Sequence, residues 1–394
     1  MKTFLKFNLN FPIYDLCQKT TLLFLILILC ILLSGCETKN DFYTGKVNYE
    51  YDDQTFFHTT HLIVSTKDGY YFFARNNLMF FDKDTQKLIP VCSQANCEHN
   101  NNSCDSYFEL LSSKRISYYD NKLLLTMYDV ENYTHYLCGV SLDGSKRTRY
   151  CDLLKLEALE GSDLEDGYVI NGDDIRELVV HRGYAYYHVT NNGENLSEIR
   201  KIKIKNNSKA EIIYTCENIY SDITRIKGFE DHIYFQSYTY TASDTEEPEV
   251  LVANLYDYNI LNEELSVCIR NSLWDYIPMS DKMYYLNEQG LNCYEFDDAR
   301  IETVLKFNAP YTISYDENYF YVDNWVDNES REISVFDKSF QLIDQIELDN
   351  IYVMCLFGDE NYLFCINGSD EGDWMEALDK SQIGTGKYEW IKLQ

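Results

Sequence analysis

This 394-residue sequence contains little proline, glycine or histidine: 5 Pro, 17 Gly and 7 His. The shortage of glycine argues against a nucleotide-binding loop, because such loops use glycines to bring backbone amides close to phosphates. The patterns G-x-S-x-G and H-E-x-x-H and the phosphate-binding loop are also absent. The sequence therefore contains no familiar catalytic motif, and we assign no catalytic residues from it.

Positive charge is also scarce. The sequence contains 34 Lys and Arg residues but 64 Asp and Glu residues, which gives a formal net charge of −30. So acidic a chain repels phosphate backbones and anionic lipid headgroups. Binding to nucleic acid and direct electrostatic docking on a membrane are therefore disfavoured, and no nucleic-acid partner is predicted. The acidic runs 244–247 and 370–373 lack the spacing of a calcium loop, and we interpret them as solvated turns.

Only one long apolar run is present, Leu22–Leu33, and Lys2, Lys6 and Lys19 precede it. It is shorter than the roughly 20 residues that span a bilayer, and it suits the apolar region of a secretory signal peptide. The following residues complete Leu33-Ser34-Gly35-Cys36, which resembles the lipobox of bacterial lipoproteins. An uncleaved signal anchor with a chance cysteine is the alternative.

The lipobox resemblance implies cleavage before Cys36 and a lipid on its sulfur. Several acyl chains on one residue would anchor the protein firmly in a membrane. The predicted organisation is a signal peptide over 1–35, a short tether over 36–43 and one domain over 44–394. The predicted location is extracytoplasmic, lipid-anchored in the bacterial cell envelope.

Sustained helical periodicity is missing too, whereas 35 Tyr and 21 Phe fall in short runs between Asp, Asn and Lys clusters, a pattern typical of many short strands. A heptapeptide of polar residues followed by an apolar, usually aromatic run recurs seven times. Its copies are DGYYFFA (68–74), DNKLLLT (120–126), RGYAYYH (182–188), EDHIYFQ (230–236), SDKMYYL (280–286), DENYFYV (316–322) and DENYLFC (359–365). The spacing is close to the roughly 40–50 residues of a four-stranded propeller blade. We therefore predict an all-β fold, a β-propeller of about seven four-stranded blades, with the heptapeptide as each second strand.

Closure of the ring must remove its open edge, so we predict that residues 44–66 pair with the last blade, 359–394. The recurring aromatics are interpreted as packing between blades, and a platform for sugar rings is the alternative. The insertion Asp152–Glu177 contains LLKLEALEG, whose helical character predicts a short surface helix.

The chain resembles a family of bacterial lipoproteins whose β-propeller is compared with that of low-density-lipoprotein-receptor-related proteins. The resemblance rests on the lipobox, the D-x-x-aromatic repeats across about 61–393, and the group Cys92, Cys97, His99 and Cys104. The family's function is generally unassigned. The receptor signature Y-W-T-D is absent, and Trp274-Asp275 is a single occurrence rather than a WD40 pattern.

The loop VCSQANCEHNNNSC, residues 91–104, supports two readings. Cys92 recurs in the repeat, at the positions of Cys151, Cys216 and Cys268, and a recurring cysteine behaves as a small buried hydrophobe. A Cys97–Cys104 disulfide is the preferred reading, because an envelope compartment permits oxidation. Alternatively, Cys92, Cys97, His99 and Cys104 supply a Cys₃His set for structural zinc. No other cofactor is predicted.

Two functions from different classes remain open. We favour a non-catalytic binding or scaffold propeller for a protein or glycan partner. The alternative is a surface polysaccharide hydrolase or lyase whose carboxylates line the central channel. His181, His188 and His232 fall in or beside second strands and are interpreted as structural.

Overall fold

The computed structural model divides the chain into two compact units, Met1–Thr44 and Gly45–Gln394, and every residue that it describes lies in the second. The described residues are 61–156, 174–191, 196–205, 208–216, 221–240, 250–270, 273–307, 310–327, 330–348, 353–368 and 374–393. The predicted signal peptide, Cys36 and the tether therefore lie outside the described residues. Within the described part, no helix has the length and apolarity needed to cross a membrane.

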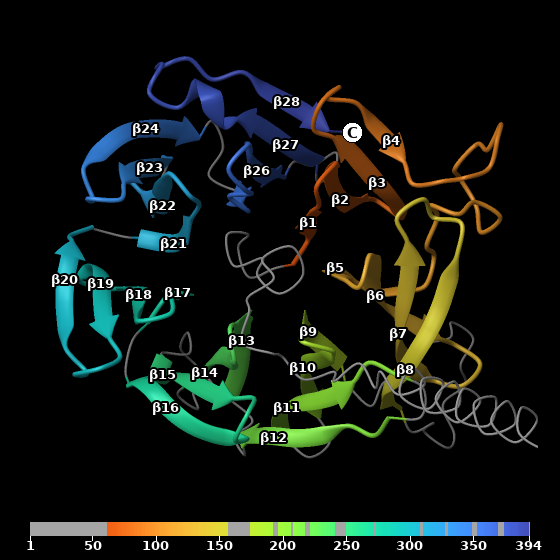
Figure 1. The fold of residues 1–394 in the computed structure, drawn as a ribbon, viewed down its shortest axis with the longest axis horizontal. Coiled ribbons are helices and arrows are strands. Elements are labelled where there is room, and N and C mark those ends of the chain that lie inside the picture. The colour runs from red at the N-terminus through yellow and green to blue at the C-terminus, as the bar shows by residue number, and fades with distance from the viewer. Residues whose placement is uncertain are drawn as a thin grey trace, which may run out of the picture. The chain divides into compact units, whose positions relative to one another are not determined.

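The described residues form seven antiparallel sheets of four strands, each in sequence order, arranged as a ring (Figure 1). Blade 1 contains β1 (Ile63–Ser65), β2 (Gly69–Ala74), β3 (Asn77–Asp82) and β4 (Leu88–Pro90). Blade 2 contains β5 (Leu111–Tyr119), β6 (Lys122–Asp129), β7 (Thr134–Ser141) and β8 (Arg147–Lys155). Blade 3 contains β9 (Asp174–His181), β10 (Tyr184–Asn191), β11 (Leu196–Lys203) and β12 (Glu211–Cys216). Blade 4 contains β13 (Ser221–Phe229), β14 (His232–Tyr240), β15 (Val250–Asn259) and β16 (Glu264–Arg270).

The remaining three blades follow the same order, with the first strand innermost and the fourth outermost (Figure 1). Blade 5 contains β17 (Asp275–Pro278), β18 (Lys282–Asn287), β19 (Gly290–Glu295) and β20 (Ile301–Leu305). Blade 6 contains β21 (Pro310–Tyr315), β22 (Tyr319–Trp325), β23 (Arg331–Asp337) and β24 (Leu342–Leu348). Blade 7 contains β25 (Met354–Cys355), β26 (Tyr362–Asn367), β27 (Trp374–Asp379), a 3₁₀ turn η1 (Lys380–Gln382) and β28 (Trp390–Leu393). The predicted seven-bladed propeller is confirmed, and each heptapeptide forms or begins the second strand of its blade.

The aromatic heptapeptides fill the spaces between blades. Successive side chains of a strand point to opposite faces, so Tyr70 and Phe72 of β2 pack toward blade 7, whereas Tyr71 and Phe73 pack toward blade 2. In the described residues the buried side chains form seven clusters, one at each interface between neighbouring blades. The interpretation of these aromatics as packing between blades is thereby confirmed.

The prediction that N-terminal residues complete the last blade is wrong for the residues described. Blade 7 has four strands of its own, and β1 pairs with β2 in blade 1. Side chains close the ring instead. The carboxylate of Asp359, in the turn of blade 7, accepts from the Lys83 ammonium (2.8 Å), Tyr70 Oη (2.5 Å) and Ser65 Oγ (2.7 Å), all from blade 1.

A similar contact joins blades 6 and 7, although its tyrosine belongs to the same blade as its aspartate. Asp316, in the corresponding turn of blade 6, accepts from Lys380 Nζ at 2.7 Å and from Tyr321 Oη at 2.5 Å. In both contacts the lysine lies over the tyrosine ring, 4.6 Å from the centroid for Tyr70 and 4.1 Å for Tyr321. We call these two Asp–Lys–Tyr contacts the blade clasps. An Asp–Lys ion pair of the same kind therefore joins blade 6 to blade 7 and blade 7 to blade 1.

The helix predicted within Asp152–Glu177 is contradicted at both ends of that insertion. Asp152–Lys155 continue β8, and Asp174–Glu177 begin β9. The apolar residues Leu153 and Leu154 are buried between blades 2 and 3. Tertiary packing therefore overrides the local helical preference. Residues 157–173 lie outside the described part.

Candidate functional site

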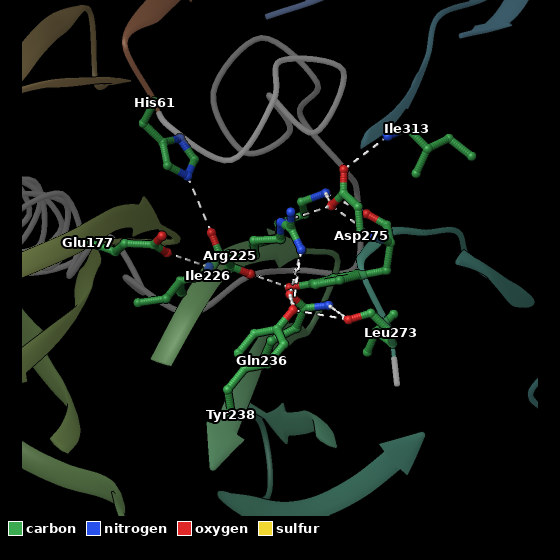
Figure 2. Close-up of polar contacts among 11 residues, drawn as sticks. His61, Glu177, Arg225, Ile226, Gln236, Tyr238, Leu273, Asp275 and Ile313 are labelled. Atoms are coloured by element: carbon green, nitrogen blue, oxygen red, sulfur yellow. Dashed lines mark hydrogen bonds and ion pairs between the residues drawn. The ribbon is translucent and has the colours of Figure 1, made fainter. Parts of the chain in front are cut away.

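A β-bulge interrupts β13, the innermost strand of blade 4. The pairing of β13 with β14 shifts between Thr224 and Lys227, and Arg225 has a left-handed φ of 57°. A bulge bends its strand and redirects a side chain. Arg225 Nη1 consequently donates to Gln236 Oε1 at 3.0 Å and to Tyr238 Oη at 3.3 Å, both on β14 (Figure 2).

Asp275, the first residue of β17, joins this bulge to blades 5 and 6. Its carboxylate, which is fully buried, accepts from Lys227 Nζ at 3.2 Å and lies 3.6 Å from Arg225 Nε. It also accepts from the backbone N–H groups of Tyr276 at 2.8 Å and Ile313 at 3.0 Å. Burial lowers the pKa of Lys227, although attraction to Asp275 opposes that shift. Asp275 is thus one buried anion shared by two cations and two amides.

Blades 1 and 3 hold the other side of the bulge (Figure 2). Glu177 Oε2 accepts from the Ile226 N–H at 2.9 Å, and His61 Nε2 lies 3.3 Å from the Ile226 carbonyl. A carbonyl only accepts, so the His61 proton lies on Nε2. Burial raises the pKa of Glu177 and lowers that of His61 to about 4, which favours the neutral form of each group. Side chains from blades 1, 3, 4 and 5 therefore converge on one irregular backbone segment.

Large aromatic side chains gather on one face of the ring. Trp274 directly precedes β17, Trp325 ends β22, and Trp374 begins β27. Since every blade has the same strand order, these positions share the face where first strands begin, which we call the entry face. Tyr311, second in β21, lies on that face too. Trp274 is 37 % exposed and Tyr311 43 %.

The buried guanidinium of Arg331 supports two of these rings. It lies 5.4 Å from the Tyr311 ring centroid and 5.1 Å from that of Trp325. Asp323 pairs with the guanidinium, and the Val353 carbonyl accepts from its Nη1. An Arg fixed in this way holds aromatic faces by cation–π attraction.

The polar network fixes the backbone that carries the third ring, Trp274. The Leu273 carbonyl accepts from Tyr238 Oη at 3.0 Å and from Gln236 Nε2 at 3.4 Å. The backbone N–H of the next residue, Trp274, donates to the Leu286 carbonyl at 2.8 Å. β17 and β21 are neighbours, joined by the bond from Ile313 to Asp275. We call Trp274, Tyr311 and Trp325 the aromatic site.

The structure brings the four predicted loop residues together. The ligand atoms of Cys92, Cys97, His99 and Cys104 all lie within 4.8 Å of one another. Cys97 and Cys104 are free thiols in this structure, and the preferred Cys97–Cys104 disulfide stays a prediction beside the metal site. Of the recurring cysteines, Cys151 is buried, whereas Cys92, Cys216 and Cys268 are half-buried. The recurrence therefore did not identify Cys92 as a core residue.

The three histidines interpreted as structural differ in their surroundings. His181 Nε2 lies 2.8 Å from the Glu230 carbonyl, and His232 Nδ1 lies 2.7 Å from Asp257 Oδ1. His188 is fully buried, and neither ring nitrogen makes a hydrogen bond of normal geometry within the described residues. Burial lowers the pKa of His188 to about 3. All three positions fit a structural role.

Sequence reasoning missed the aromatic site, although a signal was present. The chain has only four tryptophans, and three of them fall at strand ends on the entry face. Carboxylates also recur there: Asp174, Asp222 and Asp275 begin or nearly begin first strands, and each accepts from the next residue's N–H at 2.7, 2.9 and 2.8 Å. The inner carboxylates with known contacts are thus engaged with backbone amides or cations of the propeller.

No protein-family model matches the sequence, and no curated protein matches it. A prolyl endopeptidase structure aligns with a TM-score of 0.53 and 11% identity, over 86% of this chain and 50% of that one. The uncharacterized protein lmo1340 from Listeria monocytogenes EGD-e aligns with a TM-score of 0.47 and 11% identity, over 73% of this chain and 83% of that one. A chain of a nidogen/laminin complex aligns with a TM-score of 0.38 and 8% identity, over 71% of this chain and 92% of that one. At such identities the likeness concerns the fold alone.

Proposed function

We propose that this chain is a lipid-anchored, extracytoplasmic binding protein whose propeller presents the aromatic site to a protein partner. The observation that carries the proposal is the pair of exposed rings at the entry face. Tyr311 lies against the buried Arg331 guanidinium, and Trp274 directly precedes Asp275, whose carboxylate bonds blade 6. Trp, Tyr and Arg are the residue types enriched at binding hot spots. Rigid support lowers the entropy that a ring loses on binding.

The net charge of the chain limits the kind of partner that it can bind. A net charge of −30 repels acidic proteins and favours encounter with a positively charged surface. A glycan is the other class of ligand that such aromatic rings bind. We favour a protein because the Arg331 guanidinium lies against the Tyr311 and Trp325 rings, and the test below distinguishes a protein from a glycan.

Replacing both Trp274 and Tyr311 with alanine is expected to weaken binding by about 2 kcal/mol or more, roughly 30-fold. Full-length protein in its membrane would be crosslinked to its neighbours, and the captured partner would then be titrated against purified variants. Ile301→Ala, an exposed apolar position on β20 (56 % exposed), is the control and should bind as the wild type does.

Equal binding by the double variant would contradict the proposal. Captured material that survives protease digestion and releases sugars would identify a glycan instead. Cleavage of a polysaccharide by the purified chain would favour the hydrolase or lyase alternative.

The proposed anchor makes a separate prediction. Cys36 should be the N-terminus of the mature protein and carry lipid, so Cys36→Ala should move the protein from the membrane to the soluble fraction. Mass spectrometry of detergent-extracted protein measures both the N-terminus and the lipid. The control is Cys216→Ser, a cysteine within blade 3, which should leave partitioning unchanged. A different N-terminus, or a Cys36→Ala protein that stays with the membrane, would refute the anchor.

A further inference from the structure

The connection between blades 1 and 2 contains the most concentrated set of metal-ligating side chains in the described residues. It runs from the end of β4 at Pro90 to the start of β5 at Leu111. Three thiols and one imidazole, from Cys92, Cys97, Cys104 and His99, place their ligand atoms within 4.8 Å of one another. His99 Nδ1 lies 3.2 Å from Cys104 Sγ.

The backbone of the loop turns sharply to achieve this convergence. Asn96 and His99 both adopt the left-handed region, with φ values of 59° and 56°. Asn and His tolerate that region better than most residues. Asn96 directly precedes Cys97, so the first turn directs that thiol inward, and the second directs the imidazole. The loop is therefore shaped around the point where the four side chains meet.

The surroundings of Cys104 suit a thiolate. This cysteine is 2 % exposed, and its Sγ lies 3.3 Å from the Ser106 N–H and 3.1 Å from Ser106 Oγ. Sulfur is a weak acceptor when protonated and a stronger one when ionised, and metal thiolates commonly receive such contacts from their neighbours. Asp105 Oδ2 lies 3.9 Å from Cys92 Sγ and accepts from the Ser93 N–H at 3.1 Å. A second layer of polar groups thus fixes the ligand-bearing segments.

We propose that Cys92, Cys97, His99 and Cys104 bind one zinc ion as a closed structural site. Thiolate and imidazole are the ligands that zinc prefers, whereas calcium and magnesium require oxygen. Zinc–sulfur bonds of about 2.3 Å place tetrahedral ligands roughly 3.8 Å apart. Side chains already within 4.8 Å need only small rotations to reach that geometry. Four protein ligands leave no open position for a substrate.

The metal would stabilise the interface between blades 1 and 2. The residues that follow Cys104 bind blade 1: the Ser106 carbonyl accepts from the Leu78 N–H, and the Phe108 N–H donates to the Asn76 carbonyl, each at 2.8 Å. From blade 2, Arg147 Nη2 donates to the Tyr107 carbonyl at 2.8 Å. One segment therefore contacts two blades, and zinc would hold its end in place. This inference does not depend on the proposed function.

Metal analysis of full-length protein purified without reductant or chelator tests the site. We expect about one zinc ion per chain, loss of nearly all of it in Cys97→Ser and His99→Ala, and a lower thermal midpoint after chelation. Cys216→Ser is the matched control, because that cysteine occupies the corresponding repeat position on β12. It should retain zinc.

A second measurement remains informative where a loop variant does not fold. Wild-type protein exchanged with cobalt(II) should show the absorption of a tetrahedral, thiolate-ligated cobalt ion, and the loop thiols should resist alkylation until a chelator is added. Protein without zinc whose peptide map shows Cys97 joined to Cys104 would overturn the proposal in favour of the disulfide. Equal loss of zinc in Cys216→Ser would also overturn it.

Discussion

Replacing Asp359 with alanine is expected to lower the free energy of unfolding by about 3–5 kcal/mol, because it removes the shared partner of three groups of blade 1. Lys83, Tyr70 and Ser65 all donate to this carboxylate, which is 3 % exposed. Without it the Lys83 ammonium remains largely buried at the closing interface and uncompensated. Equilibrium unfolding in urea measures the loss.

The matched control is Asp281→Ala. Asp281 lies in the corresponding turn of blade 5, where its carboxylate is 68% exposed and only 3.5 Å from Lys282 of its own blade. Exposed pairs of this kind contribute little. Adding Lys83→Met to Asp359→Ala should restore part of the lost stability, because the unpaired cation is then removed as well. If Asp359→Ala and Asp281→Ala unfold alike, the clasp does not close the ring.

The clasps also predict the response to acid. Burial opposes ionisation of Asp359 and Asp316, but attraction to their lysines and hydrogen bonds outweigh it and hold the pKa of each below its usual value. Their stabilisation is therefore fully present above about pH 4, the unfolded value, and is lost as the pH falls through the folded pKa values. Asp359→Ala should show a shallower loss of stability over that range.

The second large effect is expected at Asp275. Asp275→Ala should cost about 3–5 kcal/mol, because it leaves Lys227 and Arg225 without their shared anion. It also leaves the N–H of Ile313 without its acceptor. Binding at the aromatic site should weaken too, because this residue joins the first strands that carry Trp274 and Tyr311.

Asp222→Asn is the control for this prediction. Asp222 accepts from the N–H of Ile223 at 2.9 Å, as Asp275 does from Tyr276, but burial raises its pKa even though attraction to Arg176 opposes that shift. An amide should therefore replace it with little change. Should Asp275→Ala fail to fold, Asp275→Asn retains an acceptor for one amide while removing the charge, and its urea midpoint should still fall well below that of Asp222→Asn. Equal midpoints would contradict a charge-based role for Asp275.

Some residues of the candidate sites could be predicted from the sequence. The loop residues Cys92, Cys97, His99 and Cys104 fall within 13 positions of one another, so proximity was expected and only the geometry was open. The aromatic site left only a weak signal, the three tryptophans at strand ends. Trp274 and Tyr311 lie on different blades, and a tryptophan at a strand end has the same local pattern whether its ring is buried or exposed.

The sequence by itself determined the architecture, because the heptapeptide is a local signal. Two polar residues and an alternating aromatic run specify a turn and a strand that is buried on both faces, and seven copies specify seven blades. The four-residue acid and aromatic pattern DENY even marks Asp316 and Asp359 as equivalent.

Only the tertiary structure decided how the ring closes and which charges pair. Asp359 meets Lys83 across 276 positions, and His61 meets Ile226 across 165. Strand exchange and side-chain clasps can each join the last blade to the first, so local pattern does not choose between them. The outcome depends on packing between distant segments, and so do the bulge at Arg225 and the extension of β8 through Lys155.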